Sequence, residues 1–571
     1  MGEPALRDLL RADARRSRAL QRSRFGYDPW SWWLDPGFVC VALFRVSHAL
    51  QARGWAKAAR LVMQLNSLAT GADFHPGARI GPGLLVPSPC STNISCAAGR
   101  NLLLMPQAGI GGSQARTDVG AGPGLPLLGD DVRVGQFSGV NGPFTIGDRV
   151  LVSPGSGTVR SVAADRRVRS AVQPALVERF PVQRRAPAAP LLCRHRSWRA
   201  SLTDWRADLH RFCAEVARYD GGPVSRGKLL SGALTNPMAM MFVQRFAHWL
   251  HASGWRRLGA TVASLNRLFH KISMPADSCI GGGLLAPHLA GLVVEGRVGE
   301  GVTLYANVVC AAWDGDPARA PAVGPGTTVG GHGGVVGAIH VGANVHLAPK
   351  VQLFENGEDG VQVFSPLARF CDEPQEEEEP AQHGDLATSA LPRMLGEYRR
   401  ADRARHEAYV GSGGRRSRAA RLAVRLYRSS SWCDERRRRR RARAWWLANV
   451  YLTGADISPA SRIGPGLLMP YPAGIAFHGA AGADLTLMAM SGVGAWPDGE
   501  DSLAPLARAP VLGNGVRLDH HGQVHGNVRV GTGARIMPGC TADRDVPAGA
   551  VLAPHPVRLR RPGAPATEAR R

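Results

Sequence analysis

The chain has very little lysine and few aromatic residues for its 571 positions. Only 4 of its 69 basic residues are lysine, so codon bias is one explanation of the net charge of +24, beside a binding role. Aromatic residues make up 6% and charged residues 20% of the chain, whereas 44% is apolar. That apolar content excludes disorder of the whole chain and is enough for several folded cores.

Long apolar runs and paired cysteines are also absent. No run of 18 or more apolar residues occurs, and the N-terminal segment is charged where a secretion signal has an apolar core. We therefore expect a cytoplasmic protein. The ten cysteines are scattered without CxxC pairs, which favours reduced thiols over bridges or a zinc site.

Three segments of the chain are close copies of one another. They read IGPGLLVPSP from Ile80, IGGGLLAPHL from Ile280 and IGPGLLMPYP from Ile463. A second block follows each copy, and the three blocks align without a gap from Leu128, Val323 and Leu512. Such repetition indicates a fold built from one structural unit used three times.

Within the second blocks an aliphatic residue recurs every six positions. The series are Leu128, Val134, Val140, Ile146 and Val152; Val323, Val329, Val335, Val341 and Leu347; and Leu512, Leu518, Val524, Val530 and Ile536. A period of six matches neither the 3.6 of a helix nor the 2 of a strand. It is typical of a triangular parallel β-helix, in which each short strand turns one aliphatic side chain inward.

Helical periodicity precedes the first two copies and leaves only a remnant before the third. We predict five segments: a first repeat of helices and β-helix at 1–155, an Arg/Pro-rich linker with one short helix at 156–230, a second repeat at 231–365, a linker at 366–444, and a third repeat of β-helix and tail at 445–571. The second linker opens acidic and turns basic. Its stretch 399–443 has 17 arginines and four acidic residues, a net charge of +13, which is typical of a solvated tether.

Taken together, these motifs resemble the serine acetyltransferases. They comprise the helical stretch QRFAHWL, the lead-ins GADFHP and GADIS, the IGPGLL and PHLAGLVV coils, and the hexad block. The resemblance covers about 36–155, 234–352 and 445–560. It implies a left-handed parallel β-helix of the hexapeptide-repeat type with N-terminal helical segments. Because such β-helices form trimers, three tandem copies in one chain imply an intramolecular pseudo-trimer.

The resemblance also implies a general base. In the family, a histidine after the first coil takes the proton from the serine hydroxyl as this hydroxyl attacks acetyl-CoA, and an aspartate one coil earlier orients the histidine. The base position is His288 in the second repeat, but Ser88 in the first and Tyr471 in the third. His288 is therefore the single catalytic candidate.

The aspartate position is Asp73 in the first repeat and Asp456 in the third, whereas the second repeat has Ser273 there. For Asp73 and Asp456 a part in the substrate site competes with simple bonding to backbone amides at the coil entry. The repeat that keeps the histidine thus lacks the acid that would orient it.

A third family element is an arginine that binds the substrate carboxylate. It corresponds to Arg319 and Arg508, while Gly124 stands at this position in the first repeat. The family builds each site in a groove between neighbouring subunits, so His288 would be completed by another repeat. We favour Arg508 over Gly124 for this role. A solvated arginine is the alternative interpretation of both Arg319 and Arg508.

Glycines at a corner of the second repeat would let the pantetheine arm of CoA approach the backbone closely. They are Gly330, Gly331, Gly333 and Gly334. Glycine at β-helix corners is expected on structural grounds as well.

The predicted function is an acyl-CoA-dependent O-acyltransferase resembling serine O-acetyltransferase. It would use acetyl-CoA or another acyl-CoA as co-substrate, a small amino-acid-like hydroxyl acceptor, and no metal. The alternative is a catalytically inactive scaffold or regulatory partner of another protein. Because the chain ends in Glu568-Ala569-Arg570-Arg571 and not in the isoleucine that the family inserts into cysteine synthase, we do not expect that complex.

Two groups of residues leave other functions open. The spacing of His520 and His525 is similar to that of two zinc ligands in gamma-class carbonic anhydrases, with polar corner histidines as the alternative. Asp519 and His521 lie beside them, and a third ligand would have to be His332, His340 or His346. The arginine run 436–441 could bind nucleic acid or anionic lipid by charge alone. Without interleaved aromatics we expect neither partner, and a solvated linker paired with the acidic run 376–379.

Overall fold

The computed structural model describes residues 5–25, 31–112, 117–169, 175–177, 197–220, 223–289, 291–313, 316–364, 369–371, 395–494, 509–554 and 558–560. The chain divides into two compact units. The first compact unit comprises Met1–Phe180, Leu367–His406 and Ala420–His555, and so contains the first and third repeats. The second comprises Pro181–Pro366, Glu407–Ala419 and Pro556–Arg571, and contains the second repeat.

Each repeat begins with helices. The first has α1 (Leu6–Phe25), the 3-10 turn η1 (Trp32–Leu34), α2 (Pro36–Ala52) and α3 (Ala56–Thr70). The second has α4 (Trp198–Asp220), α5 (Arg226–Ala233), α6 (Asn236–Ala252) and α7 (Arg256–His270), and the third has α8 (Leu395–Gly411), α9 (Arg418–Glu435) and α10 (Arg439–Thr453). None of these helices is both long and apolar enough to cross a bilayer, within the part of the chain that is described.

The third repeat therefore has a full set of helices and not a remnant. The five-segment division stays a prediction, but the stretch 366–444 contains α8, α9 and the start of α10 where the sequence suggested a tether. The buried face of α9 includes Ala423, Leu426 and Tyr427, with arginines interspersed among them. Those arginines hide the apolar period in the sequence, because buried Arg428 itself lies on this face.

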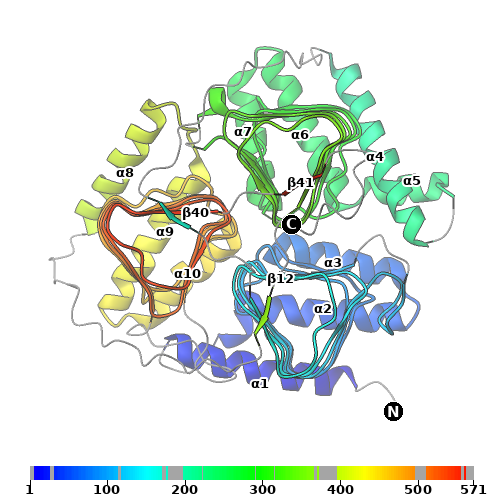
Figure 1. Cartoon of the computed structure of the whole chain (residues 1–571), viewed down its shortest axis with the longest axis horizontal. Helices are drawn as coiled ribbons and strands as arrows, with labels where there is room; N and C mark the ends of the chain where they lie inside the picture. The colour runs from blue at the N-terminus through cyan, green and yellow to red at the C-terminus, as the bar shows by residue number, and fades with distance from the viewer. Residues whose placement is uncertain are drawn as a thin grey trace. The chain divides into compact units, whose positions relative to one another are not determined.

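A parallel β-helix follows the helices in every repeat, and in Figure 1 each one appears as a stack of triangular coils with its helices alongside. The strands of the first are β1 (Asp73–Phe74), β2 (Arg79–Ile80), β3 (Asn93–Ile94), β4 (Ala97–Ala98), β5 (Leu103–Leu104), β6 (Gly109–Gly111), β7 (Leu127–Leu128), β8 (Arg133–Val134), β9 (Gly139–Asn141), β10 (Thr145–Ile146), β11 (Leu151–Val152), β12 (Gly157–Thr158) and β13 (Arg167–Arg169). They form three sheets in the orders β1-β3-β6-β9-β12, β2-β4-β7-β10 and β5-β8-β11-β13.

The other two β-helices repeat this arrangement. The second contains β15 (Cys279–Ile280), β16 (Val293–Val294), β17 (Arg297–Val298), β18 (Thr303–Leu304), β19 (Val309–Ala311), β20 (Ala322–Val323), β21 (Thr328–Val329), β22 (Gly334–Val336), β23 (His340–Val341), β24 (His346–Leu347), β25 (Gln352–Leu353) and β26 (Gln362–Phe364). The third contains β28 (Asp456–Ile457), β29 (Arg462–Ile463), β30 (Ala476–Phe477), β31 (Ala480–Ala481), β32 (Thr486–Leu487), β33 (Gly492–Gly494), β34 (Val511–Leu512), β35 (Arg517–Leu518), β36 (Gln523–His525), β37 (Arg529–Val530), β38 (Arg535–Ile536), β39 (Thr541–Ala542) and β40 (Val551–Ala553).

The hexad prediction is confirmed. None of the fifteen aliphatic residues in the three series is more than 2% exposed, so each fills the interior of its coil. Three tandem hexapeptide-type β-helices, each with N-terminal helices, are thus the fold of the chain.

A strand from outside each β-helix pairs with one strand of its last coil. These strands are β14 (Ala175–Val177), β27 (Arg369–Cys371) and β41 (Arg558–Arg560). The strand after the first β-helix, β14, pairs antiparallel with β40 of the third, while β27 pairs with β13 and β41 with β26. One of the three sheet edges at the end of each β-helix is covered in this way, which removes one site of unwanted strand pairing.

The first and third repeats contact each other within the first compact unit. The Phe137 ring stacks on His521 with ring centroids 4.7 Å apart, and the Gln107 side chain donates to the Gly474 carbonyl. Arg443 of α10 donates to Gln21 Oε1 at 2.8 Å. Two of the three repeats therefore pack as one body, and closure of a pseudo-trimer by the second repeat stays a prediction.

A buried ion pair joins the helices of each repeat to its first coil. Arg45, Arg245 and Arg428, on α2, α6 and α9, bond through Nε to Asp13, Asp208 and Asp402 at 2.8, 3.1 and 2.8 Å. Each arginine also donates to two carbonyls of the IG dipeptide that starts the coil, 35 and 36 residues further along. We call this arrangement the Asp–Arg clamp.

The aspartate of the clamp binds the second half of the same motif. Asp13 Oδ1 accepts from the amides of Gly83 and Leu84 at 2.8 Å, and Asp402 Oδ1 accepts from those of Gly466 and Leu467 at 3.0 and 2.8 Å. Gly83 and Gly466 have φ values of +86° and +82°, a conformation that favours glycine. The clamp holds this segment in a backbone conformation that needs glycine at the fourth position, which explains the last residue of the IGPG motif.

Seven cysteines are buried free thiols in the described chain, as expected: Cys40, Cys90, Cys96, Cys213, Cys310, Cys433 and Cys540. Burial raises the pKa of Cys40 and Cys310 to about 12. The expectation of reduced thiols is wrong for Cys279, which is disulfide-bonded.

Replacing Asp13 with alanine should destabilise the first compact unit by about 3–5 kcal/mol, because it leaves a buried arginine without its counter-charge. Urea unfolding followed by tryptophan fluorescence measures the change. The control is Asp165→Asn, which removes an ion pair with Arg149 whose side chains are 61% and 57% exposed. That variant should unfold at the wild-type midpoint. Equal midpoints for the two variants would contradict the role of the clamp.

Candidate functional site

His288 lies in the first coil of the second β-helix, in the turn between Leu285 and β16. It is half-buried, whereas Ser88 and Tyr471, which take its place in the other repeats, are 4% exposed. The Tyr471 ring packs near the His520 ring, with centroids 5.6 Å apart. Only the second repeat therefore offers a basic side chain with some solvent access at this position.

Arg319 lies in the short helix η2 (Pro317–Arg319), in the loop between β19 and β20. Strands β16 and β19 are parallel neighbours in one sheet. His288 precedes β16 and Arg319 follows β19, so the two residues lie at opposite ends of these strands. Whether His288 and Arg319 act in one site stays a prediction.

The structure describes only one of the two candidate arginines. Arg319 Nε is 3.7 Å from Asp316 Oδ2 of its own loop, and its side chain is 58% exposed. Arg508 lies outside the described residues. The loop that the sequence favoured as the partner of His288 is thus not placed.

The aspartate candidates begin their β-helices. Asp73 starts β1 and Asp456 starts β28, and Asp456 accepts a hydrogen bond from the Trp446 indole at 2.8 Å. Ser273, at the same position in the second repeat, is 4% exposed and its hydroxyl has no partner among the described residues. For Asp456, the bond to Trp446 supports the structural interpretation.

The glycine corner of the second repeat joins β21 to β22. A Cβ added at Gly330, Gly333 or Gly334 would lie 2.1 to 2.7 Å from atoms of the same or the next coil. At Gly331 the nearest atom, the Ala306 carbonyl oxygen, is 3.6 Å away. Coil packing therefore accounts for three of these glycines, and Gly331 alone has room beside it.

One charged residue near this corner escaped the sequence analysis. Lys350 donates its backbone N–H to the Gly331 carbonyl at 2.9 Å, and burial lowers the pKa of its ammonium to about 7. Its φ of +67° matches that of Gly155 and Gly539 at the equivalent corners of the other repeats. The sequence feature that could have revealed Lys350 is that a lysine replaces, in one repeat only, the glycine of the other two.

The histidine group of the third repeat has structural partners. Asp519 bonds to Arg517 and Arg535 at 2.6 and 2.5 Å, and His521 stacks on Phe137. Across the described residues, no three His, Cys, Asp or Glu side chains are grouped as a metal ion would require. These contacts favour the interpretation as corner residues that pack the coils together.

The stacked coils and their preceding helices define a hexapeptide-repeat protein. No family model matches the chain. It is 33% identical over 132 residues to the serine acetyltransferase of Synechococcus elongatus, a match that covers 23% of this chain and 52% of that protein. It is 31% identical over 138 residues to the serine acetyltransferase of Helicobacter pylori, covering 24% of this chain and 78% of that protein. The chain belongs to the serine acetyltransferase family.

Solved structures of the family give low overall similarity scores. A serine acetyltransferase of Neisseria gonorrhoeae is 24% identical, with a TM-score of 0.27, over 29% of this chain and 65% of that one. The chain spans about half the length of the Synechococcus relative. What the whole protein does is therefore a matter for proposal.

Two buried histidines should make the protein less stable in acid. Burial lowers the pKa of His525 to about 4, and burial together with the Lys271 charge lowers that of His270 to about 4. An unfolded chain binds these protons below a pKa of about 6.5, and the folded chain does so only near 4. Stability is thus full above that range and falls as the pH drops through it, by up to about 3 kcal/mol for each histidine.

Thermal unfolding between pH 7 and pH 4.5 measures this effect. His525→Asn should lose less of its melting temperature across the range than the wild type does. Changing the exposed His210 to asparagine should leave the pH profile as it is. A wild-type slope in His525→Asn would rule out His525 as a source of the acid sensitivity.

Proposed function

We propose that this chain is an acyl-CoA-dependent O-acyltransferase with one active groove, built around His288. Acetyl-CoA or another acyl-CoA would be the co-substrate, and the acceptor a small hydroxyl compound of the amino acid type. The observation that carries the proposal is that one repeat of three keeps a half-buried histidine at the base position of a family of acyltransferases.

His288 would act as general base. Its neutral imidazole takes the proton from the acceptor hydroxyl while that oxygen attacks the thioester carbonyl, and returns the proton to the departing thiolate of CoA. Ser273 cannot supply the charge that an orienting aspartate would give. We therefore expect a slower enzyme than one with the full pair, and an acceptor that need not be serine.

An arginine from another repeat would hold the acceptor carboxylate. What supports this is that His288 precedes β16 whereas Arg319 follows the neighbouring strand β19. Arg508 is the favoured residue, because Arg319 is within ion-pair distance of Asp316 and Gly124 has no side chain. The room beside Gly331 is where the CoA arm would approach the coil most easily.

Replacing His288 with alanine should reduce kcat by about 100- to 10,000-fold, since the hydroxyl loses its proton acceptor. Release of free CoA from acetyl-CoA in the presence of hydroxyl amino acids measures turnover. The exposed His210 serves as the control, because His210→Ala removes an imidazole elsewhere in the second repeat. Undiminished turnover in His288→Ala would exclude this histidine as the base.

Changing Arg508 to methionine should raise the KM for the acceptor by about 10- to 100-fold, because a charged hydrogen bond to the carboxylate is lost. The same change at Arg319 should raise KM less than threefold. Steady-state kinetics at saturating acetyl-CoA separates the two variants. The reverse order would place the loop of the second repeat, and not that of the third, opposite His288.

An inactive scaffold or regulatory partner is the second candidate function. Three observations favour it: Ser273 replaces the acid, Asp456 is bonded to Trp446, and Arg319 is within ion-pair distance of Asp316. Calorimetric titration with CoA distinguishes the candidates, because a scaffold should show no saturable binding. Any partner protein would then have to be found by direct capture.

A further inference from the structure

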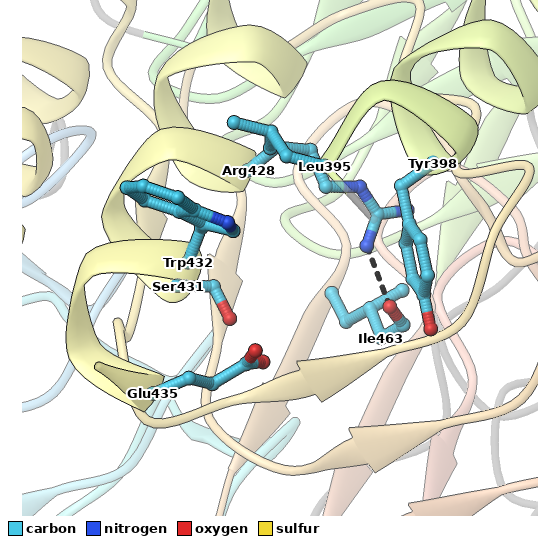
Figure 2. Close-up of a pocket in the computed structure, with 7 residues that line it drawn as sticks. All are labelled: Leu395, Tyr398, Arg428, Ser431, Trp432, Glu435 and Ile463. Atoms are coloured by element: carbon cyan, nitrogen blue, oxygen red, sulfur yellow. Dashed lines mark hydrogen bonds between the residues drawn. The ribbon is translucent and has the colours of Figure 1, made fainter. Parts of the chain in front are cut away.

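A pocket opens between α8, α9 and the first coil of the third repeat. Its lining residues are Leu395, Tyr398, Arg428, Ser431, Trp432, Glu435 and Ile463. Figure 2 shows the Glu435 carboxylate and the Ser431 hydroxyl on one side of the space, and the Arg428 guanidinium and the Tyr398 ring on the other. The pocket is thus lined by a carboxylate on one side and, on the other, by a guanidinium that is paired with Asp402.

The third repeat departs from the other two at one position of the pocket lining. Three residues after the clamp arginine stand His48 in the first repeat and His248 in the second, and their Nδ1 atoms bond to the carbonyls of Pro76 and Ala276 at 2.8 Å. The third repeat has Ser431 there. The Pro459 carbonyl, which corresponds to those of Pro76 and Ala276, accepts from Arg462 at 3.3 Å, and Ser431 lines the pocket with its hydroxyl.

The charge arises at a second position of the same kind. Seven residues after the clamp arginine, the first two repeats have Ala52 and Ala252, while the third has Glu435 at the end of α9. A hydroxyl and a carboxylate therefore appear together in the pocket lining of one repeat. A loss of packing alone would explain Ser431, but it would not explain Glu435.

The other walls are held rigidly. Arg428 is fixed by Asp402 and by the Ile463 carbonyl at 2.6 Å, and it lies 4.7 Å from the centre of the Tyr398 ring. Arg436 lies 4.1 Å from the centre of the Trp432 ring. Figure 2 shows the Trp432 indole nitrogen turned toward the same space. Preformed donors of this kind need little ordering when a ligand binds.

We propose that this pocket binds a small α-amino acid in its zwitterionic form. The ammonium group meets Glu435 and Ser431, and the carboxylate meets the Arg428 guanidinium and the Trp432 indole N–H. The Tyr398 and Leu395 side chains would contact the short apolar side chain of the ligand. The site does not depend on the proposed acyl transfer, because no residue of the His288 groove contributes to it.

Isothermal titration of the full-length protein with L-alanine tests the proposal, with propylamine and propionate as ligands that carry only one of the two charges. L-alanine should bind at least tenfold more tightly than either, since both charged walls are then used. Glu435→Gln should weaken binding tenfold or more. Ser431→His, which restores the residue of the other repeats, should abolish it.

Glu397→Gln is the matched control, because Glu397 is an exposed acid on α8 outside the pocket. It should bind L-alanine like the wild type. Propylamine binding as tightly as L-alanine would overturn the zwitterion assignment. Binding that survives Ser431→His but is lost in Arg508→Met would place the amino acid in the acyl-transfer groove, and would overturn the proposal without touching the proposed function. No binding of L-alanine would overturn it as well.

Discussion

The Asp–Arg clamp is the interaction on which every repeat depends. A β-helix leaves the backbone groups of its first coil without a coil on the outer side, and these groups must find partners. In each repeat the clamp supplies them from two helices, with one arginine donating to two carbonyls and one aspartate accepting from the amides that follow. Burying a charged pair costs desolvation energy, and these backbone bonds offset part of that cost.

A frame fixed in this way lets the positions around it diverge. The base position is serine, histidine and tyrosine in the three repeats, and the position three residues after the clamp arginine is histidine, histidine and serine. Neither series disturbs the coils, whose hexad residues stay buried in all three. Three copies in one chain can therefore take on different tasks, which identical subunits of a homotrimer cannot do.

The fold could be predicted from the sequence because the hexad period is local and tolerates few exceptions. The helices of the third repeat could not, since arginines at buried positions such as Arg428 break the apolar pattern of α9. The clamp was also invisible, although Asp-x-x-Arg occurs at Asp13, Asp208 and Asp402. Its partner arginines stand 26 to 37 residues away, and only the folded chain brings them together. For the site, the choice of His288 stays a prediction, and the sequence could not show that this histidine is half-buried while Ser88 and Tyr471 are buried.

The contacts of the arginines give a structural reason for the preference for arginine over lysine. Arg405 donates to the Gly466 carbonyl at 2.7 Å and to Thr486 Oγ1 at 2.8 Å, while its Nη1 lies 3.2 Å from Asp484. Arg443 bonds to Ser31 and Gln21 while 3% exposed. A planar guanidinium with five donors can serve two or three partners at fixed angles, which a lysine ammonium on a flexible stem does less well. Part of the +13 charge that the sequence assigned to a tether thus holds helices and coils together, while the expectation of no nucleic-acid or membrane partner for the exposed run 436–441 stays a prediction.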